Sequence, residues 1–166
     1  MLLRSRTLAM IATLVLPALL VGCEDDPPAK PKLKARETIG KTTQEVRDLK
    51  AEVAKGGQVT DGKIHATDYL GLQADAYRTT VGNIAKMSVK HAMDLYEIPN
   101  DTKIKSYDEF MDLIIQKGKP DGIMLPMLPY YQEYGYDSVA RELVVIEYPA
   151  KKKAMEEQSD RELGRK

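Results

Sequence analysis

The residue types that most often carry metal binding or redox chemistry are scarce in this sequence. There is one cysteine, Cys23, and there are two histidines, His65 and His91. A zinc site needs three or four ligands in a suitable geometry, and no pair of candidate ligands here has metal-binding spacing. A single thiol also excludes an internal disulfide framework and a multi-cysteine cluster. We therefore expect no metal and no other cofactor, with both histidines solvated or locally hydrogen-bonded.

Serine and carboxylate chemistry also lacks a recognisable arrangement. The sequence contains neither the Gly-x-Ser-x-Gly turn of serine hydrolases nor a glycine-rich phosphate-binding loop. The acidic pair Asp108–Glu109 is better explained by helix capping, and Glu156–Glu157 lies in a charged C-terminal stretch. Carboxylates that perform acid–base catalysis must lie in a pocket. We therefore predict no catalytic residue, and a protein that is not an enzyme.

Four clustered tyrosines form the most suggestive candidate surface: Tyr130, Tyr131, Tyr134 and Tyr136. Tyrosine combines a large, rigid contact area with a polar tip, which suits binding faces. Alternation along a strand would place Tyr130, Tyr134 and Tyr136 on one side. Two interpretations stay open. Core packing of at least one set is favoured, and a surface for a protein partner or a glycan is the alternative.

Composition separates a tyrosine-rich central region from charged ends. The chain has 166 residues, and all nine tyrosines lie between Tyr69 and Tyr148. Basic and acidic residues number 25 each, so there is no large positive field to collect nucleic acid. Residues 23–36 combine prolines with alternating charge and predict a disordered tether. Residues 150–166 predict a charged tail that is disordered or loosely helical.

Residues 37–57 show a helical pattern that ends at a pair of glycines. Ile39, Val46 and Val53 recur every seven residues, with Thr42 and Leu49 between them. This spacing predicts an amphipathic helix. It is either a short coiled-coil seam or a helix that packs on its own domain.

The core material between residues 58 and 149 predicts a small α+β domain. We expect a long helix over residues 67–97, a short helix opened by the capping box at 106–109, an apolar strap at 123–129 and a β-hairpin at 130–146. Long N-terminal helices would pack on the short capped helix and on the C-terminal antiparallel hairpin. The apolar stripe of the long helix comprises Leu70, Ala74, Tyr77, Val81, Ile84, Ala92 and Leu95, with Ala85, Val89 and Tyr96 beside it.

The N-terminus has the pattern of an export signal. Arg4 and Arg6 precede an apolar run over residues 8–21, which has signal-peptide length and falls short of the ~20 residues that span a bilayer. The run ends in Leu-Val-Gly-Cys at residues 20–23, which resembles the lipobox of bacterial lipoproteins.

This resemblance implies that residues 1–22 are a signal peptide, cut between Gly22 and Cys23, and that the Cys23 thiol carries diacylglycerol. Two or three acyl chains hold a protein firmly on a membrane. The next residue is Glu24 rather than Asp, which by the family's sorting rule favours the outer membrane over the inner one. The expected location is the cell envelope, facing the periplasm, with the membrane as a partner through covalent lipid.

A second resemblance covers residues 84–148. The order of a long helix, a capped short helix, an LP-containing strap and a tyrosine-rich hairpin resembles the globular half of type II secretion pseudopilins. The Asp-Glu-Phe-Met block at 108–111 and the Leu-Pro-Met-Leu-Pro block at 125–129 are similar to those of a group of bacterial lipoproteins. The sequence lacks the prepilin cleavage site of pseudopilins and has no tryptophan. This likeness therefore implies a helix-plus-sheet fold, and it does not imply pilus assembly.

These features lead to two expectations about function. The first is a lipid-anchored periplasmic protein of structural or protein-interaction type, with an envelope protein or a second copy of itself as partner. The alternative is a module that binds a small ligand or a glycan on the tyrosine-rich hairpin. Neither expectation involves nucleic acid.

The lipid anchor is testable by removing the thiol. A Cys23→Ser chain should stay unlipidated and lose firm attachment, because serine has no thiol to form the thioether with the diacylglyceryl group that carries the acyl chains. Membrane fractionation under a high-salt wash measures this. If Cys23→Ser sediments with membranes as completely as the native chain, the lipoprotein assignment is wrong.

Overall fold

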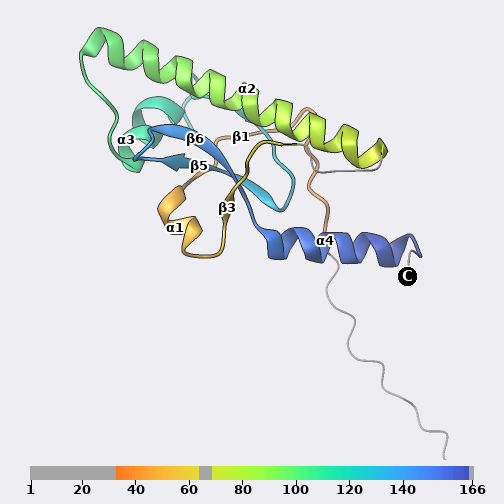
Figure 1. Ribbon diagram of the computed structural model, residues 1–166. Helices are drawn as coiled ribbons and strands as arrows, with labels where there is room; N and C mark the ends of the chain where they lie inside the picture. Colours follow the sequence, from red (N-terminus) through yellow and green to blue (C-terminus); the bar gives the residue numbers. More distant parts are fainter. Residues whose placement is uncertain (1–32, 64–68, 165–166) are drawn as a thin grey trace, which may run out of the picture. The chain divides into compact units, whose positions relative to one another are not determined.

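The computed structural model describes residues 33–63 and 69–164, with the side chains of 69–74 excluded. The predicted signal peptide, Gly22, Cys23, most of the tether and His65 lie outside these residues. The described residues belong to one compact unit of mixed α+β structure, as predicted (Figure 1). Within them, no helix combines the length and the apolar character needed to cross a membrane.

The centre of the fold is a four-stranded sheet in the order β2-β5-β6-β3. Strands β5 (Gln132–Asp137) and β6 (Glu142–Glu147) form the predicted antiparallel hairpin. On one edge, β2 (Val46–Asp48) runs parallel to β5, and on the other β3 (Gln58–Val59) runs antiparallel to β6. The apolar run in β6 is buried along both faces, which fits a strand covered by other elements on each side.

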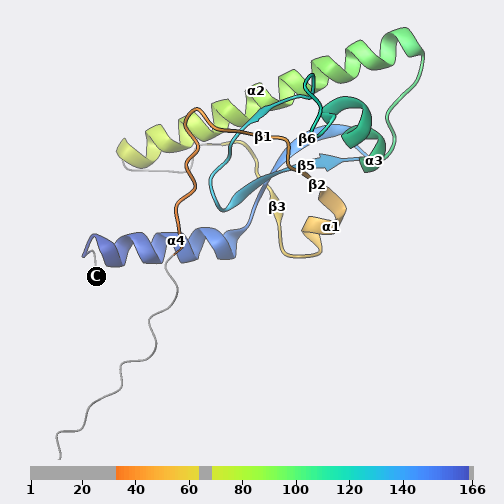
Figure 2. The same ribbon diagram turned by 180° about the vertical axis from the view of Figure 1, so that it is seen from behind.

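Helix α2 (Tyr69–Asn100) crosses one face of this sheet, and α1 (Leu49–Val53) and α4 (Pro149–Glu162) lie on the side away from it (Figures 1 and 2). The long helix is confirmed, but its buried face is rotated from the predicted stripe. The buried residues are Val81, Ala85, Val89 and Met93, whereas Tyr77, Ile84 and Leu95 are exposed. The rotation has a local cause, because Gly82 and Ala85 are small enough to let the helix approach β6 closely. A Cβ at Gly82 would lie 3.2 Å from Val145 Cγ2.

The capping box opens helix α3 (Tyr107–Phe110), which continues into a π-helical turn, η1 (Met111–Ile115). Ser106 Oγ accepts a hydrogen bond from the Glu109 amide at 3.1 Å, as predicted. The Glu109 carboxylate reaches one residue further back than expected, to the amide of Lys105 at 2.9 Å. The box buries Phe110 completely against the sheet.

The apolar strap is confirmed as extended chain over the core. Its strand β4 (Leu125–Pro126) pairs antiparallel with β1 (Thr42–Thr43). Leu125 and Leu128 are buried. The prolines fit here because an edge segment of only two paired residues does not need every amide as a donor.

The predicted helix over residues 37–57 is wrong, and so is the coiled-coil seam. Residues 42–48 are mostly extended, and only Leu49–Val53 are helical. Val46 is 2% exposed because it lies in β2 beside β5, while Ile39 and Val53 are exposed. The seven-residue spacing is therefore unrelated to a helical face. Backbone pairing with the open edge of β5 outweighs a weak helical preference.

The charged tail was predicted to be disordered or loosely helical, and the structure shows the helical form as the 14-residue helix α4. Pro149 sits in its first turn, where its missing N–H costs nothing. None of its residues is buried, so ion pairs, hydrogen bonds and cation–π contacts of its partly exposed side chains hold it. Lys152 pairs with Glu147 at 3.2 Å, and Gln158 exchanges hydrogen bonds of 2.7 and 3.1 Å with the backbone of Leu33.

Tyrosine hydroxyls join the strap to the sheet, which predicts a measurable effect of removing one. Tyr134 donates a hydrogen bond to the Pro126 carbonyl at 2.9 Å. Tyr134→Phe should lower the free energy of unfolding by about 1 kcal/mol, because the partly buried Pro126 carbonyl loses this donor. Urea denaturation measures the change. Tyr130→Phe is the matched control, since its hydroxyl makes no hydrogen bond to a described residue. Equal stability of both variants would contradict this role.

Candidate functional site

The tyrosine cluster does not form a single surface. Tyr134 and Tyr136 are 1% and 0% exposed, so their assignment to a partner surface is wrong and the core interpretation is right for them. Alternation along β5 directs both toward the same buried side. Tyr136 stacks on Phe110 with ring centroids 4.0 Å apart, and burial raises the pKa of the Tyr134 hydroxyl.

Tyr130 and Tyr131 are half-buried, and cations already occupy positions over their rings. Lys151 Nζ lies 5.7 Å from the Tyr130 ring centroid. Arg78 and Lys152 lie 5.7 and 5.9 Å from the Tyr131 centroid. These distances are within the range of cation–π attraction. A sugar that stacked on either ring would have to compete with these contacts, so the structure weakens the hairpin as a glycan site.

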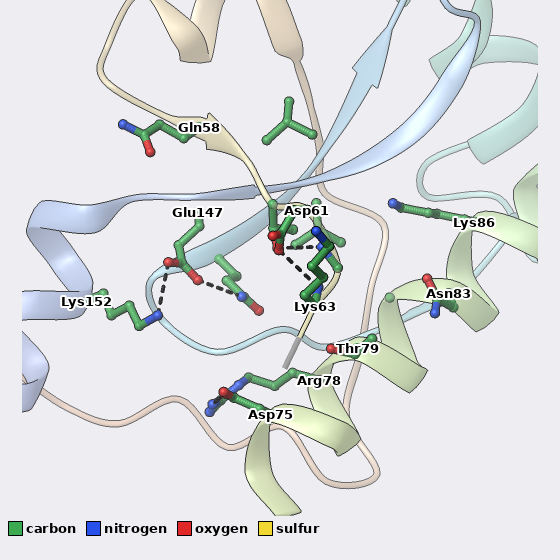
Figure 3. Close-up of a pocket in the computed structure, with 16 residues that line it drawn as sticks. Gln58, Asp61, Lys63, Asp75, Arg78, Thr79, Asn83, Lys86, Glu147 and Lys152 are labelled. Carbon is green, nitrogen blue, oxygen red and sulfur yellow. Dashed lines mark hydrogen bonds and ion pairs between the residues drawn. The ribbon is translucent and has the colours of Figure 1, made fainter. Parts of the chain in front are cut away.

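A polar pocket of about 140 Å³ lies where α2, the segment after β3 and the open end of the hairpin meet (Figure 3). The segment after β3 is held on the sheet by a hydrogen bond of 2.9 Å from the Thr60 amide to the Val145 carbonyl. Its turn is closed by the Asp61 carboxylate, which accepts from the Lys63 amide at 3.0 Å. From α2, Lys86 extends toward this segment.

The charges in this pocket are largely engaged with one another. Arg78 pairs with Asp75 on α2. Across the pocket, the Glu147 carboxylate accepts from Gln132 at 3.0 Å and from Lys152 at 3.2 Å. No nucleophile is placed beside a base among its described lining residues. The pocket offers hydrogen-bonding groups of both signs, which can hold water or a small polar molecule, and its arrangement specifies no reaction.

The described parts of the chain contain no arrangement of side chains suited to metal binding or to histidine chemistry. Within residues 33–63 and 69–164, no group of three or more His, Cys, Asp or Glu side chains could hold a metal ion. His91 is exposed on α2. Asp108 and Glu109 lie in the first turn of α3. The pair Glu156–Glu157 lies on the exposed helix α4.

Sequence reasoning missed a buried carboxylate, Glu52, which is 8% exposed on α1. Tyr148 donates a hydrogen bond of 2.6 Å to one carboxylate oxygen, and Lys55 approaches the other at 2.7 Å. The contact with Lys55, followed by that with Tyr148, holds the pKa of Glu52 below its ordinary value. Lys151 lies 3.9 Å from the Tyr148 ring centroid on the other side. With both oxygens engaged, this cluster fastens α1 and the start of α4 to the sheet.

A second missed cluster fixes the C-terminal end of α2. Arg141, in the hairpin turn at φ 58°, pairs with Glu97 and donates a hydrogen bond of 3.0 Å to the Ile104 carbonyl. Glu97 also accepts from the Ile104 amide at 2.9 Å. The Arg141 guanidinium holds the pKa of the Glu97 carboxyl below its ordinary value of 4.5. The end of the helix is thereby tied to both the hairpin and the following loop.

The candidate site is an exposed apolar row on the outer face of α2, which we call the outer row. Its members and their exposed fractions are Tyr77 43%, Ile84 52%, Met87 73%, Leu95 62% and Ile98 79%. In both views of the fold, α2 has the sheet on one side and no other described element on its outer side (Figures 1 and 2). Scattered single exposed apolar residues are ordinary, whereas a continuous row along one helix marks an interaction surface.

Comparisons with protein-family models, with curated proteins and with solved structures found no match to this chain. The case for a function therefore depends on the residues of the chain and their arrangement.

The ion pair at the end of α2 predicts a pH-dependent stability. Because the pKa of Glu97 is lower in the folded chain, its contribution is present above about pH 4.5 and is lost as the pH falls through the folded pKa. Glu97→Gln should lower the free energy of unfolding by about 2 kcal/mol at pH 6 and by much less at pH 3.

Urea denaturation at the two pH values measures this difference. Glu142→Gln removes one exposed carboxylate from β6 and is the charge-matched control, with stability near that of the native chain at both pH values. A Glu97→Gln deficit that is the same at pH 3 and pH 6 would show that the Arg141 contact contributes nothing.

Proposed function

We propose that this chain is a lipid-anchored envelope protein that works through protein contacts, and that the outer row of α2 is its contact surface. The single observation that carries the contact surface is the row itself. Five large apolar side chains lie exposed along one helix whose opposite face is fully packed. Leaving them in water costs free energy that a partner surface recovers on binding.

The anchor part of the proposal rests on the lipobox-like residues 20–23 and on Cys23, which lie outside the described residues. The proline-rich stretch after Cys23 has the composition of a semi-extended spacer. An anchored domain on such a spacer stays close to the membrane while remaining able to meet partners along it. Restriction to a membrane raises the effective concentration of such partners.

The rigidity of α2 supports a role in binding. One face of the helix packs into the main core, and the Glu97–Arg141–Ile104 cluster secures its C-terminal end. A side chain held on a rigid helix loses little entropy when a partner covers it, so contact is favoured. Apolar residues three, four and seven apart along a helix are the pattern with which helices bind apolar grooves or other helices.

The alternative function, capture of a small ligand or glycan by the tyrosine-rich hairpin, has less support. Two of its four tyrosines are core residues, and the rings of Tyr130 and Tyr131 face cations. The polar pocket beside α2 is small, and its charges are largely paired. The outer row is therefore the better candidate.

A charge placed in the outer row should abolish binding. The full chain carries a photo-crosslinking benzoylphenylalanine at Ser88, an exposed position beside the row, and is illuminated in its own membranes. We expect a crosslinked product of discrete mass. Met87→Glu should reduce it about tenfold or more, because a carboxylate would be buried without a partner.

Lys90→Gln is the matched control, since it changes the charge of the same exposed helix by the same amount outside the row. It should leave the crosslinked product unchanged. Thermal melting confirms that both variants fold. Equal crosslinking of Met87→Glu and the native chain, or no product of discrete mass from either, would overturn the proposed contact surface.

A further inference from the structure

The outer row has a seven-residue period, which points to a helical partner. Three of its members, Tyr77, Ile84 and Ile98, lie at multiples of seven residues, and the exposed His91 takes the position between Ile84 and Ile98. Met87 and Leu95 lie beside them. Seven residues bring an α-helix back to within about 20° of the same direction, so these positions share one face. From Tyr77 to Ile98 the row is about 32 Å long at 1.5 Å per residue. A repeat of seven is the period with which two helices pack along each other.

We propose that the outer row is covered by a second copy of this chain, with the two α2 helices packed antiparallel. The inference rests on the proposed function, since it names the partner of the same surface. The row is balanced about its centre, between Met87 and Ser88. An antiparallel two-fold axis there sets Tyr77 against Ile98 and Ile84 against His91, and it brings Met87 beside its own counterpart. A surface that complements itself in this way suits a two-fold dimer.

The antiparallel direction follows from the residues that would otherwise meet. In a parallel, in-register pair each residue faces its own copy, so His91 faces His91 and Tyr77 faces Tyr77. Two facing tyrosines leave a wider gap beside Ile84. Antiparallel packing places a large side chain against a medium one at each end. It also lays the His91 ring on an aliphatic side chain.

The apolar area is sufficient for such a pair. Five side chains exposed by 43% to 79% offer on the order of 500 Å² of apolar surface per copy, which is as large as the patches that mark interaction sites. Two copies together would bury on the order of 1,000 Å², the level at which specific interfaces begin. The polar residues that flank the row would add to this area.

A lipid surface fits the row less well than a second copy. Helices that lie on membranes carry many Lys or Arg residues along the polar face. Here, Lys90 is paired at 3.5 Å with Asp94, which stands directly beside the row. Anionic lipid would repel that carboxylate. A seven-residue repeat also gives a helix no advantage in binding a flat bilayer.

Cysteine crosslinking of the full chain in membranes tests both the partner and its direction. With Cys23 acylated, each added cysteine is the only free thiol, and a disulfide forms only where two Cα atoms come within about 7 Å. Under mild oxidation, Met87→Cys should give a covalent dimer of twice the chain mass. Ile98→Cys alone should give none, whereas Ile98→Cys expressed together with Tyr77→Cys should give a mixed dimer.

Val53→Cys is the control for random collision, because Val53 is 51% exposed on α1, which lies on the side of the sheet away from α2. Self-crosslinking of Ile98→Cys, with no mixed dimer, would overturn the antiparallel arrangement. Dimers from none of the row positions, or as much dimer from Val53→Cys, would overturn pairing with a second copy.

The same samples separate this inference from the proposed function. If the row cysteines give no dimer while the benzoylphenylalanine at Ser88 still yields a product that Met87→Glu removes, the partner is a different protein. The proposed function then stands and the second copy is excluded. If the Ser88 product is also absent, and a dye on Met87→Cys is quenched by brominated phosphatidylglycerol vesicles, lipid covers the row and both proposals fail.

Discussion

The close packing of helix α2 on the β5–β6 hairpin is the contact on which the rest of the structure depends. Gly82 brings the helix so near β6 that a Cβ there would lie 3.2 Å from Val145, and Ala85 is fully buried one turn further on. Because protein interiors pack at nearly crystalline density, this contact sets the rotation of the helix about its axis. The exposed outer row follows directly from that rotation, since its residues lie away from the two small ones.

The charged groups inside the fold consolidate this arrangement. Glu97 and Arg141 join the end of α2 to the hairpin turn, and Glu52 joins α1 to Tyr148. A charge withdrawn from water needs partners for its hydrogen-bonding groups, and both the buried Glu52 and the partly buried Glu97 have them. Each cluster places an acidic side chain beside a proton donor, as a catalytic acid–base pair would. Here these contacts link neighbouring elements of the fold. These charged clusters therefore support the shape of the protein, and the surface with the strongest case for function is apolar.

Elements with a local cause were predictable from sequence. The capping box at Ser106 forms wherever serine and glutamate stand three apart before an apolar run, and the proline-rich strap cannot be a helix. Residues 37–57 were mispredicted because their fate depends on a distant strand edge, to which Val46 pairs. The four tyrosines of the cluster also separated into buried and half-buried residues because of tertiary contacts. Neighbouring side chains of one type took opposite roles according to which of them faced the core.

By itself, the sequence determined the α+β class, the long helix and the hairpin, because each depends on residue type or short-range spacing. Its lipobox-like segment also leads to the prediction that Cys23 carries an anchor. Only the tertiary structure decided which face of α2 is buried. The apolar residues of that helix cover much of its circumference, so periodicity could not separate the packed face from the free one. Contact with β6 through Gly82 and Ala85 made that choice, and it left the outer row exposed.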